Sequence, residues 1–303
     1  MKRSTIQLGG KTLLISLPHQ WVTRNGVRKG QELSLTEEEQ GLLISVEAER
    51  PKRIVALNAR TCGKLLRRIV LGCYLEGVHE IRITHSSEHV AQLHDLSKEF
   101  IGFDIVRQDS ATTIFQDFAH ENENNIHAVV TRAFYILKAM IAEGKESLKR
   151  NDKKILAVIT AFDVALNKAT HYSYRYSRKN DVPKEEALII PLISSTLESC
   201  GDVYKSTIAL ALNETSTKEH IIMHDHIEAL LDAVLKLTLN RTTEHAIECA
   251  NAYDSAIKTI SKKNQTRTTD RYREIIGNMI SLQSCQLGML KEIEKINEGA
   301  LFH

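Results

Sequence analysis

The sequence predicts a multidomain α+β protein, and three changes of pattern along its 303 residues support this. Short apolar runs separated by glycines fill the first fifty residues and predict two β-hairpins. Strand-like and helix-like runs then alternate up to about residue 118, which favours a small α/β unit. Helical periodicity follows to the last residues and predicts an all-α bundle. We therefore expect domains at 1–50, 52–118 and 119–303.

The first expected element is a hairpin with strands at 5–8 and 12–17. Gly9-Gly10 lies between them and tolerates the positive φ of a tight turn. Pro18 then favours the start of a short helix, because its fixed φ and missing N–H cost nothing at the first helical position. Asn25-Gly26 is expected to end that helix, since both residues accept a left-handed conformation.

A second hairpin is expected from strands at 32–35 and 42–46, with the acidic run Glu37–Gln40 as a loop. Four such strands from one copy bury too little surface to be stable alone. We therefore expect two copies to form an intertwined homodimer through this segment.

Positive charge gathers in the same segment. Residues 1–31 contain no Asp or Glu, and their cationic side chains are Lys2, Arg3, Lys11, Arg24, Arg28 and Lys29. A dimer would bring two such patches together, which is typical of proteins that bind a phosphate backbone. The alternative is a solvated basic surface with no partner. The acidic run after the patch would repel phosphate, so we expect it on the face away from DNA.

The order and spacing of several residues in this segment resemble the SpoVT-AbrB, or swapped-hairpin, DNA-binding domain. The matching residues are Gly9, Gly10, Ser16-Leu17-Pro18, Trp21, Gly26, Lys29-Gly30, Glu32-Leu33 and Gly41. The resemblance implies that two chains interlock their hairpins and present basic loops and strands to DNA.

The composition of the whole chain excludes several classes of protein. The net charge is +2, so any contact with nucleic acid must come from a local patch. The sequence has no apolar leader and no apolar run of membrane-spanning length, so a soluble, cytoplasmic protein is expected. Its five cysteines show no CxxC spacing, which argues against a disulfide framework and against a zinc ribbon.

The middle segment is expected to form one sheet with both helices on one side. We predict strands at 53–57, 80–84, 103–108 and 112–118 and helices at 60–76 and 89–100. Gly77 and Gly102 are expected to cap the two helices. Four histidines occur here, but their spacing gives no compact set of metal ligands; they are His79, His85, His89 and His94.

The last segment is expected to contain six long antiparallel helices, a number that suggests two repeats of three. Apolar residues recur at spacings of three and four, as at Ile126, Val130, Ala133, Leu137 and Met140. Polar breaks between the helices are expected at 149–152, 179–183, 214–217, around 242 and at 262–269, and the last stripe continues to Ile296.

Two carboxylates of the third long helix form a candidate site. Glu198 and Asp202 are four residues apart and share one helical face, so they repel each other unless something neutralises them. A divalent or ferric ion would do so, and so would Lys or Arg from a neighbouring helix. Gly201 leaves room for another helix to approach closely.

The stretch TLESCGDVYKSTI around these carboxylates resembles the signature helix of PhoU, the phosphate-uptake regulator. The resemblance implies a six-helix, two-repeat bundle that binds metal clusters and regulates phosphate transport, with Asp163 as a further ligand. An AbrB-type domain before a PhoU-like bundle is the arrangement of archaeal-type phosphate uptake regulators. The chain departs from the pattern at Ser199-Cys200, and Gln283 and Leu287 stand where a second pair of carboxylates is expected.

A rival metal candidate is the pair His220 and His224, which are one helical turn apart. No Glu follows His220 as in the H-E-x-x-H motif, and the pair lies at a helix start, where exposed polar residues are expected.

These patterns favour a dimeric DNA-binding transcriptional regulator whose bundle senses phosphate status through metal or a partner protein. The alternative is an adaptor that does not bind DNA and regulates a phosphate transporter or a signalling partner by contact. An enzyme is disfavoured, because the sequence shows no nucleophile–base pair, phosphate-cradling loop or complete metal triad.

Overall fold

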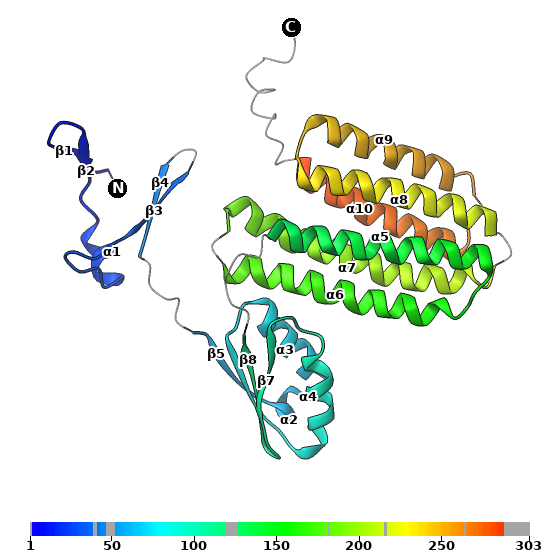
Figure 1. Cartoon of the computed structure of the whole chain (residues 1–303), viewed down its shortest axis with the longest axis horizontal. Helices are drawn as coiled ribbons and strands as arrows, with labels where there is room; N and C mark the ends of the chain where they lie inside the picture. Colours follow the sequence, from blue (N-terminus) through cyan, green and yellow to red (C-terminus); the bar gives the residue numbers. More distant parts are fainter. Residues whose placement is uncertain are drawn as a thin grey trace, which may run out of the picture. The chain divides into compact units, whose positions relative to one another are not determined.

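The computed structural model describes residues 2–38, 41–46, 52–118, 126–180, 182–214, 217–263 and 265–287. The chain divides into two compact units, residues 1–51 and residues 52–303. Figure 1 shows the strands and short helix of the first unit, and the sheet and long helices of the second.

The first unit contains two separate two-stranded antiparallel sheets. Strands β1 (Ile6–Leu8) and β2 (Thr12–Leu14) form the first hairpin, with Ile6 opposite Leu14. Helix α1 (His19–Arg24) follows Pro18 and ends before Gly26, which has a φ of +63°. Strands β3 (Ser34–Glu38) and β4 (Gly41–Ser45) form the second hairpin.

The prediction of a loop at Glu37–Gln40 is wrong for its first two residues. Glu37 and Glu38 belong to β3, where they lie opposite Leu42 and Gly41 of β4. In an antiparallel ladder every second pair exchanges backbone hydrogen bonds, and continuing this pairing extends the strand to Glu38. Residues 39 and 40 lie outside the described part of the chain.

The second unit begins with a four-stranded sheet of order β5-β6-β8-β7, in which β5 and β6 are parallel and the other pairs are antiparallel. The strands are β5 (Ile54–Asn58), β6 (Glu80–Thr84), β7 (Phe103–Gln108) and β8 (Thr112–Asp117). Helices α2 (Ala59–Cys62), α3 (Leu66–Leu75) and α4 (Val90–Ser97) lie beside the sheet in Figure 1. Buried residues of α3 and α4 join those of the strands in one core.

The single helix predicted at 60–76 is interrupted. Gly63 has a φ of +51°, so the α-helical path breaks there and continues through a 3₁₀ turn, Gly63–Leu65, into α3. Only glycine adopts that backbone conformation at low cost. Gly77 and Gly102 follow the two helices with φ values of +72° and +69°, as expected of C-terminal glycines.

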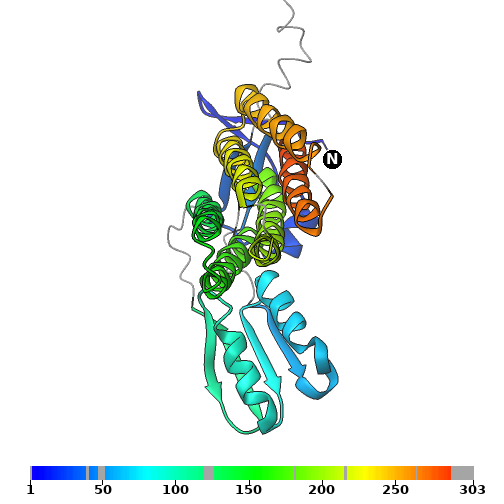
Figure 2. The ribbon, with the colours of Figure 1, turned by 90° about the vertical axis from the view of Figure 1, so that its right-hand side faces the viewer.

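Long helices form the rest of the second unit, and they are packed side by side in Figure 1 and seen nearly end-on in Figure 2. Their bounds are α5 (Ile126–Arg150), α6 (Ile155–Lys179), α7 (Lys184–Ala211), α8 (Thr217–Leu239), α9 (Thr243–Ile260) and α10 (Arg267–Leu287). The predicted polar breaks coincide with the connections between them. The predicted continuation to Ile296 lies outside the described residues.

One apolar core runs through these helices. Helix α7 contacts α5, α6 and α10, and α8 contacts α5, α9 and α10. Within the part of the chain that the structure describes, none of the helices combines the length and the apolar character needed to cross a bilayer.

A buried ion pair between α6 and β8 links the sheet to the bundle. Arg175 of α6 is 1% exposed, and its guanidinium donates to the carbonyl oxygens of Tyr74 and Val78 at 2.5 and 2.9 Å. It also donates to Asp117 Oδ2 at the end of β8, at 2.6 Å, and Lys179 Nζ lies 2.9 Å from the same oxygen. Burial alone would raise the pKa of Asp117, but the two cations hold it below its usual value.

Candidate nucleic-acid interface

The basic residues of the first unit lie on two turns and on the segment before β1. Lys11 stands in the β1–β2 turn, where Gly9 has a φ of +68°. The antiparallel register therefore places it at the opposite end of the hairpin from Lys2 and Arg3. Arg24, Arg28 and Lys29 occupy the end of α1 and the turn after it.

Hydrogen bonds shape the turn after α1. The N–H of Val27 donates to the carbonyl of Val22 at 3.0 Å, and the N–H of Arg28 donates to Gln31 Oε1 at 3.0 Å. Gly30 has a φ of +82°, which reverses the chain toward β3. Each of the two turns beside Arg28 contains a residue that suits it. Asn25-Gly26 forms the turn before Arg28, and Gly30 forms the turn after it, because glycine accepts a positive φ at low cost.

All six cationic side chains are exposed; they are Lys2, Arg3, Lys11, Arg24, Arg28 and Lys29. Unlike most cations of the long helices, none of them forms an ion pair with another described residue. Their positive charge is therefore available to an external anion, and residues 1–31 contain no carboxylate side chain to repel one.

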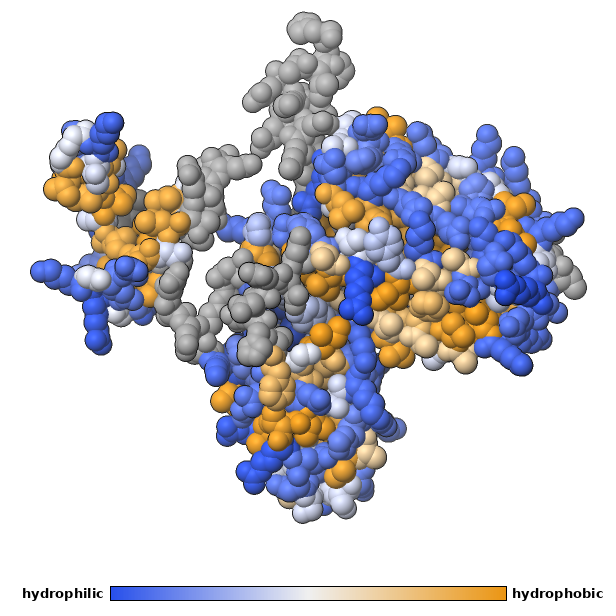
Figure 3. Space-filling model, in the orientation of Figure 1, coloured by the Kyte–Doolittle hydropathy of each residue, from blue (hydrophilic) through white to orange (hydrophobic). Residues whose placement is uncertain are grey.

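The first unit also exposes its apolar residues. None of its residues whose exposure the structure describes is buried, and Ile6, Leu8 and Leu13 are at least 60% exposed. Leu14, Ile15, Leu35 and Leu42 are exposed by 43% or more. Figure 3 shows this hydrophobic surface in orange over the first unit, beside hydrophilic side chains. A single copy of this unit thus leaves these apolar side chains in contact with solvent. This is the arrangement expected if a second copy covers them in a dimer.

The carboxylates predicted to bind metal have protein partners. Lys205 Nζ lies 2.5 Å from Asp163 Oδ2 and 3.5 Å from Asp202 Oδ1, and the bond to Asp163 raises the pKa of Lys205. We expected a bound cation, or a Lys or Arg of a neighbouring helix, to neutralise Glu198 and Asp202. Instead, a lysine of α7 itself supplies positive charge to Asp202 and Asp163. Gly201 confirms the close approach of helices, because a Cβ there would lie 2.5 Å from Leu166 Cδ2 of α6.

Glu198 is directed to a different partner, His171 of α6, whose Nε2 lies 3.4 Å from Glu198 Oε1. No group of three His, Cys, Asp or Glu side chains placed to hold a metal occurs among the described residues. The buried atoms Asp163 Oδ1 and His171 Nδ1 nevertheless have no hydrogen-bond partner. Metal binding at Glu198, Asp202 and Asp163 stays a prediction, and it would require the cation to displace Lys205. At the expected second position, Gln283 is buried and donates to the carbonyl of Ala246.

The expectation that His220 and His224 are exposed is wrong. They are 3% and 0% exposed, because this face of α8 is turned toward Tyr204 of α7 and Tyr272 of α10. His224 Nε2 is 2.8 Å from the hydroxyl of Tyr204, and its Nδ1 is 2.7 Å from the carbonyl oxygen of His220. The hydroxyl of Tyr272 completes the cluster at 3.2 Å from Nδ1.

Burial lowers the pKa of His224 to about 4, so its imidazole is neutral at neutral pH. Sequence reasoning missed this cluster, because Tyr204 and Tyr272 are distant from His224 in the chain. The signal available was the position of His220 and His224 on the apolar stripe of α8, together with Met223 and Ile227.

Comparison with known families finds a match to the model of "Antidote-toxin recognition MazE, bacterial antitoxin" over residues 6–55. It supports a MazE/AbrB-like domain at this end of the chain. No curated protein and no solved structure matches the chain.

Proposed function

We propose that this protein is a DNA-binding regulator that acts as a homodimer and contacts DNA through its first unit. The observation that carries the proposal is the set of six exposed cations without ion-pair partners among the described residues, in a segment free of acidic residues up to position 31. The MazE-type match over residues 6–55 supports it, because the match contains the β1–β2 turn, α1 and the turn after α1.

Counterion release predicts how this binding depends on salt. Each phosphate neutralised by a Lys or Arg contributes about one unit to the slope of log affinity against log salt concentration. We expect the quadruple variant Arg3→Ala/Lys11→Ala/Arg24→Ala/Lys29→Ala to bind duplex DNA more weakly and with a shallower slope. Fluorescence anisotropy at several salt concentrations measures both quantities.

The control for this variant removes the same charge from exposed positions of the second unit: Arg150, Lys154, Lys258 and Lys262, each changed to Ala. We expect the control to keep the parental slope, because net charge alone does not create a contact. If the first quadruple variant binds DNA as well as the parent does, the basic patch is only surface charge and the proposal fails.

Dimerisation is the second part of the proposal. The apolar side chains of β1 and β2 need a partner, and a second copy of the same segment presents the matching surface. Replacing Leu13, which is 66% exposed, by Glu should weaken association at least about tenfold, because a carboxylate would then be buried. Leu188→Glu on α7 is the control, since Leu188 is 71% exposed. Light scattering over a dilution series measures association, and equal behaviour of the two variants would contradict the proposal.

We further propose that the bundle senses phosphate status. The support for this part is the PhoU-like stretch around Glu198. Repeating the DNA titration with inorganic phosphate, Mn²⁺ or Fe³⁺ tests this part. A change in DNA affinity that Glu198→Gln/Asp202→Asn abolishes is the expected result. An adaptor that works by protein contact alone would show no DNA binding under any of these conditions.

A further inference from the structure

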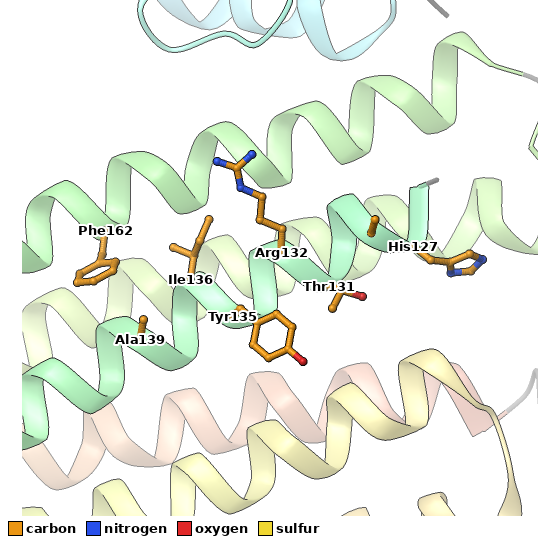
Figure 4. Close-up of a pocket in the computed structure, with 8 residues that line it drawn as sticks. His127, Thr131, Arg132, Tyr135, Ile136, Ala139 and Phe162 are labelled. Carbon is orange, nitrogen blue, oxygen red and sulfur yellow. The ribbon is translucent and has the colours of Figure 1, made fainter. Parts of the chain in front are cut away.

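Helix α5 carries an exposed groove on the side that borders α6. The groove has a volume of about 600 Å³, and its lining is mostly apolar. Ile136 and Ala139 of α5 line it together with Phe162 of α6, and Tyr135, which is 58% exposed, stands at its margin. In Figure 4, Ile136 and Arg132 point toward α6, and the ring of Tyr135 points away from it. Figure 3 shows a band of hydrophobic surface over α5 and α6.

Two charged residues of α5 bracket this apolar surface. Arg132 lines the groove at one end, and Glu143 lies eleven residues further along the helix. Both are exposed, and neither forms an ion pair or a hydrogen bond with any described residue. By contrast, two lysines of the same helix are paired: Lys138 with Asp232 of α8, and Lys145 with Asp225 and Glu228.

The positions of these residues define one face of the helix. Eleven residues correspond to three turns, so Arg132 and Glu143 lie in line, with Ile136 and Ala139 between them. The face therefore has a positive end, an apolar middle and a negative end. If a copy of this face is turned end for end, its charges oppose those of the first copy, so the surface is complementary to itself.

We propose that this face of α5 is an interface with a second copy of the chain, in which the two α5 helices pack antiparallel. Arg132 then pairs with the partner's Glu143 at both ends of the contact. Ile136 of each copy packs on the partner's Ala139, whose short side chain lets the helices approach, and Tyr135 covers the groove margin. The occupant is a second copy, because an unrelated partner would have no reason to match both ends of the face equally.

This interface is separate from the proposed one in the first unit, and it does not depend on DNA binding. If both exist, pairing of the first units raises the effective concentration of one α5 face for the other. A weak contact between helices would then become populated in the dimer without a large buried area.

A photo-cross-linking experiment on the full chain tests the proposal. Tyr135, which is exposed and so leaves room for a larger aromatic group, is replaced by p-benzoylphenylalanine, which forms a covalent bond to nearby C–H groups on irradiation. A covalent dimer on a denaturing gel, with the cross-linked peptide mapped to residues 132–143 of the other copy, is the expected result. The same amino acid at Leu188, an exposed position of α7, serves as the control and should give little covalent dimer.

Charge reversal then tests the pairing itself in the Tyr135 background. Arg132→Glu and Glu143→Arg should each reduce the cross-linking yield about fivefold or more, because each places like charges opposite one another twice. The double variant Arg132→Glu/Glu143→Arg restores opposite charges and should recover the yield. Since all these substitutions are at exposed positions, circular dichroism should show unchanged helicity and melting.

Three outcomes would overturn the inference: a cross-link mapped outside α5, equal yields at positions 135 and 188, or a double variant no better than the single ones. Measuring DNA binding of the same variants distinguishes a failure of the α5 interface from a failure of the DNA-binding proposal. Loss of the cross-link with intact DNA binding removes only the α5 interface, and the reverse result removes only the DNA proposal.

Discussion

Replacing Arg175 by alanine is expected to lower the free energy of unfolding of the second unit by about 3 to 5 kcal/mol. The change leaves the nearly buried carboxylate of Asp117 with Lys179 alone. It also removes the donors to the carbonyl oxygens of Tyr74 and Val78, and it takes away a guanidinium that lies over the rings of Tyr74 and Phe103. Urea unfolding followed by circular dichroism measures the loss.

Arg178 provides a matched control for this prediction. It lies about one turn further along α6 and contacts Glu76, the residue after α3, at 3.3 Å, but both side chains are 47% exposed. Arg178→Ala should therefore cost less than about 1 kcal/mol, as for other exposed ion pairs. Arg175→Lys should remain well below the parent, because one ammonium group cannot reproduce the planar set of donors. Equal effects of Arg175→Ala and Arg178→Ala would show that the buried ion pair does not fasten the sheet to the helices.

The pH dependence of stability should follow from the same contact. The folded state holds the pKa of Asp117 below its unfolded value, so the contribution of Asp117 is complete above the unfolded pKa. It is lost as the pH falls through the folded pKa, because the unfolded chain binds the proton first. The Arg175→Ala variant should therefore lose less stability on acidification than the parent.

Local patterns predicted most of the secondary structure because local physics determines it. The stripe from Ile126 to Met140 lies in α5, and its residues are buried as the helical period requires. The polar breaks near residues 149–152 and 262–269 fall between helices for the same reason. Gly63 escaped prediction, because its positive φ is required by the path of the chain from β5 to α3 and not by its immediate neighbours.

The candidate sites were less predictable, because they depend on contacts between distant segments. The spacing of Glu198 and Asp202 suggested a need for positive charge, but it could not show that Lys205 would contact Asp202 and Asp163 while Glu198 lies beside His171. The apolar stripe of α8 was a signal for the burial of His224, but the sequence of that helix could not show that Tyr204 and Tyr272 would contact its ring. The basic patch was accessible to sequence analysis because it consists of neighbours in one short segment.

Gly144 should tolerate no side chain, although alanine is normally preferred in a helix. A Cβ at this position of α5 would lie 1.9 Å from the hydroxyl oxygen of Tyr204 and 2.9 Å from its Cζ. Tyr204 is 0% exposed, and its hydroxyl is fixed between the carbonyl of Ile141 and Nε2 of His224. The ring cannot move aside without breaking these contacts.

We expect Gly144→Ala to lower the free energy of unfolding by about 2 to 5 kcal/mol. Overpacking of a core costs about 1 to 3 kcal/mol, and an unsatisfied buried imidazole adds about 1 to 3 kcal/mol. Gly277→Ala in α10 is the control, because a Cβ there meets nothing within 4 Å. It should stabilise the protein by about 0.5 to 1 kcal/mol through helix propensity alone.

A double variant separates the clash from other effects of the substitution. Tyr204→Phe removes the oxygen that lies closest to the new methyl group, while it leaves the ring in the core. Gly144→Ala/Tyr204→Phe should therefore be more stable than the sum of the two single changes predicts, by about 1 kcal/mol or more. If the two changes are simply additive, the side chain of Tyr204 is not held against α5, and the hydrogen-bonded position of His224 beside it would be wrong as well.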